Sequence, residues 1–203
     1  MTRIHSITIL ALSWTAWCFL HSLLNSRGFT ARMKEIMGRI YGYYRLAYTI
    51  FSLLTLVPVI YYQAQLGQEA IFAWPWPWFF LVKYGMYAGA FLLFYGGFRV
   101  YDIQYMLGIK QVQQMRHGNG TDTMEFTSEG ILGYVRHPWY SGAILLVCAF
   151  GDVTDVSLVS KTVLTVYIIF GAFLEEQKLI HEIGEPYRLY RTKVPMFIPW
   201  KIE

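Results

Sequence analysis

Charged residues are scarce in this chain, and their scarcity limits the classes of protein it can belong to. Asp, Glu, Lys and Arg make up 15% of the 203 residues, against about 25% in an average soluble protein. Hydrophobic residues make up 55%, and they fall in long blocks. This composition excludes a disordered chain, which needs low hydrophobicity, and it disfavours a soluble globule. We therefore expect a small polytopic membrane protein.

Cysteine is also scarce, with only two residues in the chain. Cys18 and Cys148 both lie inside apolar stretches, where a free cysteine behaves as a small buried hydrophobe. Two such residues make neither a disulfide framework nor a set of metal ligands. We expect no metal site.

Acidic residues are fewer than basic ones, 13 against 17, and the net charge is +4. An excess of basic over acidic residues can indicate nucleic-acid binding, but the cytoplasmic loops of membrane proteins also carry an excess of Lys and Arg. We therefore expect the lipid bilayer as a partner, and no nucleic acid.

Apolar blocks of helical length recur along the chain. A membrane helix needs about 20 mostly apolar residues. The blocks are Ile7–Leu24, Leu46–Leu66, Phe79–Val100, Tyr140–Phe150 and Val156–Leu174. The fourth is only about half a crossing long, so it is either a short span lengthened by its flanks or one arm of a helical hairpin. The pattern predicts an all-α bundle of about five transmembrane helices.

Connecting segments that carry Lys and Arg alternate along the chain with segments that carry none. Residues 25–45 carry five, 67–78 none, 101–139 three, 151–155 none and 175–203 five. Because positive segments stay in the cytoplasm, we expect the N-terminus outside and a C-terminal helix inside. The membrane would be an inner, plasma or internal membrane.

The first polar motif lies before the fourth block and reads Gly133-Tyr134-Val135-Arg136-His137-Pro138-Trp139-Tyr140-Ser141-Gly142. Pro138 favours a helix start, so Arg136 and His137 would lie at a helix N-terminus. The free N–H groups there suit a carboxylate, and Gly142 allows close backbone approach. A charged interfacial anchor with a capping proline is an equal alternative.

The second polar motif follows the last apolar block. Glu175 and Glu176 come directly after Leu174, where adjacent carboxylates are costly unless solvated, paired or functional. We expect the helix to continue into the cytoplasm, with at least one glutamate facing the bundle. That carboxylate could hold a cation or accept hydrogen bonds from ribose hydroxyls or an amino group. A solvated helix end is the alternative.

The two motifs together resemble a known enzyme superfamily. Arg-His-Pro-x-Tyr-x-Gly at 136–142 is followed by Glu-Glu-x-x-Leu at 175–179 and by Gly-x-x-Tyr-x-x-Tyr-x-x-x-Val-Pro-Met-Phe-Ile-Pro at 184–199. This order is similar to that of the isoprenylcysteine carboxyl methyltransferase and phospholipid methyltransferase superfamily of integral membrane enzymes. Many members carry Gly-Pro-Tyr before the Arg-His-Pro motif, whereas this chain has Gly-Ile-Leu at 130–132.

The resemblance implies S-adenosylmethionine (SAM) bound on the cytoplasmic side and a substrate that enters from the bilayer. Glu176, together with Glu175, would hold the polar end of SAM. Arg136 would pair with the methionine carboxylate or with a glutamate of the family. The full set of implied cofactor residues is Arg136, His137, Tyr140, Gly142, Glu175, Glu176 and Tyr187. The chain would be a single membrane domain, 1–203, with the substrate side in 1–100 and the SAM core in 130–199.

The N-terminal half resembles the branch of methanethiol S-methyltransferases and their relatives. The residues concerned are His-Ser-Leu-Leu-x-Ser at 21–26 and Asp-x-x-Tyr-Met-x-Gly-x-x-Gln at 102–111. A related family, the haem-dependent zeta-carotene isomerases, supplies an alternative function in which His21 and His137 would be axial ligands. A membrane protein that has kept the motifs without catalysis is a third possibility.

Methyl transfer from a sulfonium is an in-line displacement and needs no covalent enzyme intermediate. A free thiol is only a few per cent thiolate at neutral pH, and a nearby cation raises that fraction. Arg45, Arg99 and Arg136 are the candidates, because each lies near a predicted cytoplasmic helix end. An amine acceptor would instead need a base. The candidate bases are Glu175, Asp102 and His21, and the acceptor could be a small thiol, an amine, a carboxylate or a lipophilic molecule.

Overall fold

Helices account for nearly all of the regular structure in the computed structural model, which describes residues 2–74, 78–117 and 126–199. Four helical segments are long and apolar enough to cross a membrane, namely Arg3–Asn25, Arg27–Gln65, Trp78–Val100 and Asp155–Ile183. They contain the predicted blocks at 7–24, 46–66, 79–100 and 156–174 almost entirely, so the predicted all-α membrane bundle is confirmed. Many of their outward side chains are apolar, such as Leu54, Phe91 and Phe170, as expected where lipid rather than water surrounds a helix.

The chain divides into two compact units. The first takes in Met1–Gly67 and Asp102–Met124, and the second Gln68–Tyr101 and Glu125–Glu203.

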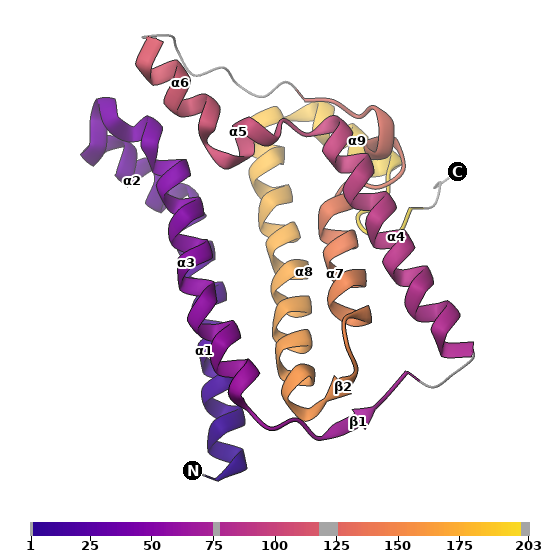
Figure 1. The fold of residues 1–203 in the computed structure, drawn as a ribbon. Helices are drawn as coiled ribbons and strands as arrows, with labels where there is room; N and C mark the ends of the chain where they lie inside the picture. The colour runs from indigo at the N-terminus through magenta and orange to yellow at the C-terminus, as the bar shows by residue number, and fades with distance from the viewer. Residues whose placement is uncertain (1, 75–77, 118–125, 200–203) are drawn as a thin grey trace. The chain divides into compact units, whose positions relative to one another are not determined.

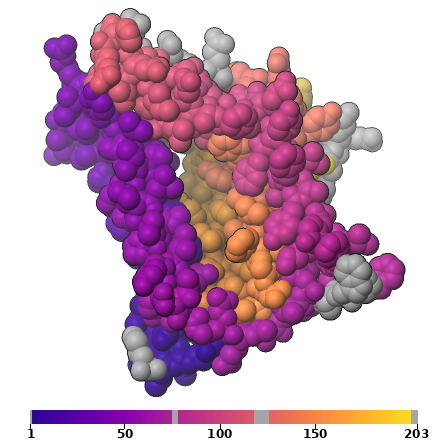
Figure 2. Space-filling model, viewed as in Figure 1, coloured from indigo at the N-terminus to yellow at the C-terminus, as the bar shows by residue number. Residues whose placement is uncertain are grey.

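The first unit is built on a pair of long helices, α1 and α3, whose side chains lie against each other along the pair (Figure 2). Its elements are α1 (Arg3–Asn25), α2 (Arg27–Met37), the 3₁₀ helix η1 (Gly38–Tyr43), α3 (Tyr44–Gln65), α5 (Ile103–Leu107) and α6 (Ile109–His117). The Trp14 indole N–H donates to Gln63 Oε1 at 2.8 Å, and the Trp17 indole N–H donates to the Ser52 carbonyl at 3.2 Å. Such bonds hold apolar helices together where no hydrophobic force does so.

The second unit packs three apolar helices side by side, with α7 against both α4 and α8 (Figure 1). Its elements are β1 (Ala70–Phe72), α4 (Trp78–Val100), the 3₁₀ helix η2 (Gly130–Gly133), α7 (Pro138–Ala149), β2 (Val153–Thr154), α8 (Asp155–Ile183) and α9 (Glu185–Lys193). The two strands form a short antiparallel pair. A Cβ on Gly97 would clash with the Trp139 indole, and one on Gly142 would lie 3.2 Å from the Ala90 carbonyl. Both glycines therefore allow α4 and α7 to approach closely.

Local sequence explains where the helices of this unit begin and end. Pro138 is the first residue of α7, as predicted, where its missing N–H costs nothing. Thr154 and Ser157 form a reciprocal capping box at the start of α8. As the sequence predicts, α8 runs beyond Leu174, and it ends at Ile183. Gly184 then turns the chain into α9 with a φ of +78°, which suits glycine.

The short helix α7 ends well inside the length of its neighbours. Its 12 residues span about 18 Å, against a hydrocarbon core of about 30 Å. The Lys161 ammonium on α8 donates to the carbonyls of Val147, Cys148 and Phe150, at 3.0, 2.9 and 2.7 Å. Because these bonds satisfy the last carbonyls of α7, the helix can stop early and return through β2 into α8. The segment is thus one arm of a helical hairpin, one of the two arrangements that its length allowed.

Candidate active site

The turn before α7 is held by the segment that follows α9. The backbone N–H of Arg136 donates to the Pro195 carbonyl at 2.9 Å, and that of His137 donates to the Met196 carbonyl at 3.1 Å. The Arg136 guanidinium also donates to the carbonyls of Arg191 and Val194. These bonds fix the first polar motif against the C-terminal part of the chain.

Glu176 lies at the centre of this arrangement, with its side chain only 2% exposed. Arg136 Nε donates to Glu176 Oε1 at 2.6 Å, and His137 Nε2 lies 3.4 Å from the same oxygen. Arg191 Nε lies 3.0 Å from Oε2. A carboxylate so deeply buried is tolerable only when it is paired, and here two guanidinium groups and an imidazole surround it.

Glu175 has different surroundings although it directly precedes Glu176 in the chain. Its side chain is 43% exposed, and Oε2 lies 3.8 Å from His137 Nδ1. The ring of Tyr140 stacks on that of His137 with centroids 5.4 Å apart. An accessible carboxylate thus lies beside two stacked rings, at the edge of the buried network. Such a combination suits a cationic ligand, because a carboxylate and an aromatic face both attract positive charge.

Tyrosines surround the network on its other sides. The Tyr190 hydroxyl donates to the Leu132 carbonyl at 2.6 Å, and burial raises the pKa of Tyr190 to about 12. Burial, followed by the negative charge of Glu176, raises the pKa of Tyr187. Burial and the charge of Glu175 likewise raise the pKa of Tyr101, whose ring packs edge-on against Trp139. All three phenols are therefore neutral at physiological pH and act as packing and hydrogen-bonding groups.

The structure brings most of the predicted cofactor residues together in the second unit. The cluster contains Arg136, His137, Tyr140, Glu175, Glu176 and Tyr187. Gly142 is one turn into α7 and faces α4. Arg99 is exposed near the end of α4, with a guanidinium nitrogen 3.4 Å from the Tyr95 hydroxyl, and within the described residues it has no hydrogen bond to the cluster.

The remaining predicted site residues belong to the first unit. Arg45 Nε donates to the Met106 carbonyl at 2.8 Å, and its guanidinium lies over the Tyr105 ring. Asp102 caps α5 and pairs with Lys110, and the hydrogen bond from Lys110 lowers the pKa of this carboxyl group. His21 lies on α1, with a ring nitrogen 2.8 Å from the Tyr48 hydroxyl.

Arg191 and Tyr101 are cluster residues that the sequence does not single out, and Tyr190 belongs to the quoted motif at 184–199 but is not among the predicted cofactor residues. Arg191 follows Tyr187 by four residues on α9, so the two share a helix face. Because Tyr187 is one of the predicted cofactor residues, this spacing indicates that Arg191 also faces the site. Tyr101 directly follows the last residue of α4, and nothing in its local sequence connects it with residues 130–199.

The fold and the cluster define a helical membrane protein with a buried Arg–Glu–His network at one end of its helices. The chain belongs to the NnrU family, whose model, described as NnrU protein, matches residues 9–185.

Relatives with assigned names are similar over about half of the chain. Methanethiol S-methyltransferase 1 of Bradyrhizobium diazoefficiens is 34% identical over 115 residues, which is 57% of this chain and 40% of the relative. Methanethiol S-methyltransferase of Crocosphaera subtropica is 35% identical over 95 residues, 47% of this chain and 37% of the relative. The match thus spans about two-fifths of the length of these relatives. No solved structure matches the chain.

Proposed function

We propose that this protein is a SAM-dependent methyltransferase that acts on a small thiol. The relatives that share half of the chain are named for methyl transfer to methanethiol. The two polar motifs also resemble the isoprenylcysteine and phospholipid methyltransferase superfamily. The observation that carries the proposal is the accessible Glu175 carboxylate beside the stacked rings of His137 and Tyr140.

The residues of the cluster fit the charges of SAM. SAM carries two positive groups, a sulfonium and an ammonium, which a protein carboxylate and aromatic faces attract. SAM also carries a carboxylate of its own, which a cationic side chain of the protein would bind. Glu175 and Tyr140 supply the first two features. Arg191, 36% exposed on its side chain, supplies the cation. When bound there, SAM would provide an activated methyl group.

Glu176 and Arg136 take a positioning role in this proposal. Glu176 is closed off from solvent, and Arg136 is already bonded to Glu176 and to two carbonyl oxygens. Of the two partners that the resemblance implies for Arg136, the glutamate therefore agrees with these contacts. The pair holds His137 and the segment after α9 in place, and Glu175 faces the cofactor.

We further propose that the cluster opens on the cytoplasmic side of the membrane. The support is the excess of Lys and Arg in residues 25–45, 101–139 and 175–203. Soluble SAM would then reach the site directly, and an apolar acceptor would enter from the bilayer.

Titration of the detergent-purified protein with SAM tests the cofactor assignment. We expect saturable binding with a micromolar dissociation constant, measured by isothermal calorimetry. S-adenosylhomocysteine, which lacks the sulfonium charge, should bind more weakly if Glu175 and the rings recognise that charge. Absence of binding by the intact protein would overturn the assignment.

A further inference from the structure

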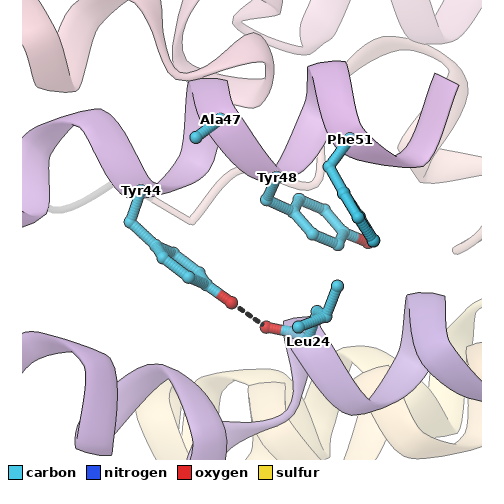
Figure 3. A pocket seen from close by; sticks show the side chains of 5 residues that line it. All are labelled: Leu24, Tyr44, Ala47, Tyr48 and Phe51. Carbon is cyan, nitrogen blue, oxygen red and sulfur yellow. Dashed lines mark hydrogen bonds between the residues drawn. The ribbon is translucent and has the colours of Figure 1, made fainter. Parts of the chain in front are cut away.

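A pocket of about 220 Å³ lies between the end of α1 and the start of α3, both in the first unit. Figure 3 shows the side chains that line it, which are Leu24, Tyr44, Ala47, Tyr48 and Phe51. The Tyr44 hydroxyl donates to the Leu24 carbonyl at 2.5 Å, and the Tyr48 hydroxyl lies 2.8 Å from His21 Nε2. Because both hydroxyl groups are engaged, the pocket wall is mainly carbon. Its volume is below the roughly 300–1,000 Å³ of pockets for drug-sized ligands, and it suits part of a hydrocarbon chain.

A basic segment, residues 27–43, joins α1 to α3 at the same end as the pocket and consists of α2 and η1. It carries four basic residues and one acidic residue, namely Arg27, Arg32, Lys34, Arg39 and Glu35. Glu35 lies 3.5 Å from Arg32, so the other three basic residues have no acidic partner within the segment. Ile36 and Ile40 are 64% and 58% exposed. Exposed basic and apolar side chains on one short segment are typical of chains that lie among lipid headgroups.

The helix α2 packs beside the pocket with one face and exposes basic residues on another. Phe29 and Met33 are half-buried, and the Phe29 ring lies 6.4 Å from that of Tyr44, a residue of the pocket wall. Arg27 and Lys34 are both exposed, and because they are seven residues apart they lie on the same side of the helix. The pocket therefore has a cationic helix face as its neighbour.

The corner between α1 and α2 keeps Arg27 close to the pocket. Arg27 follows Leu24 by only three residues, so their Cα atoms are within about 11 Å of each other. The corner itself is fixed by Ser26, whose hydroxyl accepts from the Phe29 N–H at 3.4 Å and whose carbonyl accepts from the Thr30 N–H at 2.9 Å. A cationic group and an apolar pocket are thus held together at one end of a pair of apolar helices.

We propose that this part of the first unit binds an anionic phospholipid of the surrounding bilayer, an inference that goes beyond the proposed function and does not depend on it. One acyl chain occupies the pocket, and the phosphate binds Arg27 and Lys34. Each half of the lipid then meets matching chemistry, since cationic side chains attract a phosphate and an apolar wall accepts a hydrocarbon chain.

An anionic phospholipid matches this site better than a zwitterionic lipid or a soluble anion does. The quaternary ammonium group of phosphatidylcholine repels Arg27 and Lys34, whereas phosphatidylglycerol carries only the negative charge of its phosphate. A soluble phosphate compound satisfies the cations but leaves the apolar pocket unfilled. Only a lipid with a net negative charge uses both features.

Native mass spectrometry of the detergent-purified protein tests the selectivity for the headgroup. We expect dioleoylphosphatidylglycerol to bind at least tenfold more tightly than dioleoylphosphatidylcholine, because each basic residue near an anionic lipid contributes about a fivefold gain in affinity. Arg27→Gln combined with Lys34→Gln should therefore weaken phosphatidylglycerol binding by about 10- to 30-fold and leave phosphatidylcholine binding unchanged.

The control for the charge change is Arg188→Gln combined with Lys193→Gln, which removes the same charge from exposed positions on α9. Its affinity for phosphatidylglycerol should equal that of the wild type. Equal binding of the two lipids by the wild type, or equal losses in the two double variants, would overturn the assignment of Arg27 and Lys34 to the phosphate.

Filling the pocket tests the place of the acyl chain. Ala47→Phe should weaken phosphatidylglycerol binding roughly tenfold, the effect of losing the burial of about two methylene groups. Ala47→Leu takes its place if the first variant unfolds on heating below the wild type. The control is Ala64→Phe, an exposed position near the other end of α3, which should bind the lipid as the wild type does. Wild-type affinity in a folded Ala47 variant would overturn the assignment of the pocket to the acyl chain.

Discussion

Replacing Glu175 with glutamine should weaken SAM binding by roughly 10- to 100-fold and leave the fold intact. The change removes one charge from a side chain that is 43% exposed and that lies 3.8 Å from His137. A charge-assisted hydrogen bond is worth about 1.5–3 kcal/mol, and each 1.4 kcal/mol is a factor of about ten in affinity. Calorimetric titration with SAM measures the loss.

The control for this variant is Glu182→Gln, which changes an exposed glutamate seven residues further along α8. Its SAM affinity should equal that of the wild type, and both variants should unfold at the wild-type temperature. Unchanged affinity in Glu175→Gln would show that another group receives the cationic part of the cofactor. A loss confined to Glu176→Gln, with no loss of stability, would reverse the roles assigned to the two glutamates.

Replacing Arg136 with methionine should destabilise the protein by about 3–5 kcal/mol, the usual cost of breaking a buried ion pair from one side. Glu176 would remain buried while losing its 2.6 Å partner, and the carbonyls of Arg191 and Val194 would lose their donor. Thermal or denaturant unfolding of the detergent-solubilised protein measures the change. SAM binding should fall as well, because the turn before α7 would no longer be fixed.

A double variant separates the ion pair from general damage. Replacing a buried pair by apolar residues is often close to neutral, so Arg136→Met combined with Glu176→Met should be more stable than Arg136→Met alone. The control is Arg188→Met on α9, an exposed residue 4.0 Å from Glu185, which should cost less than about 1 kcal/mol. If Arg136→Met is as stable as the wild type, the network does not hold the C-terminal segment.

The apolar blocks predict the long helices well because their burial in lipid depends mainly on local composition. Pro138 and the polar residues after Leu174 likewise predict, from local rules, where α7 starts and that α8 continues. The short strands β1 and β2 are not foreseen, because the antiparallel pair joins segments about 80 residues apart.

The distinction between Glu175 and Glu176 could not be drawn from the sequence. Adjacent residues on a helix point about 100° apart, and the rotation of α8 against its neighbours decides which one is buried. The contact between Arg191 and Glu176 could not be predicted for a similar reason, because it depends on the turn at Gly184 between α8 and α9. Local patterns thus identify the motifs, and tertiary packing assigns the roles within them.

Transfer of a labelled methyl group is the most direct test of the methyltransferase function. The purified protein is incubated with ethanethiol and with SAM that carries a deuterated methyl group, and the headspace is analysed by mass spectrometry. We predict ethyl methyl sulfide with three deuterium atoms, formed by the wild type and by Glu182→Gln but at least tenfold more slowly by Glu175→Gln at subsaturating SAM. No labelled sulfide from a wild-type protein that binds SAM, or equal rates in all three proteins, would contradict it.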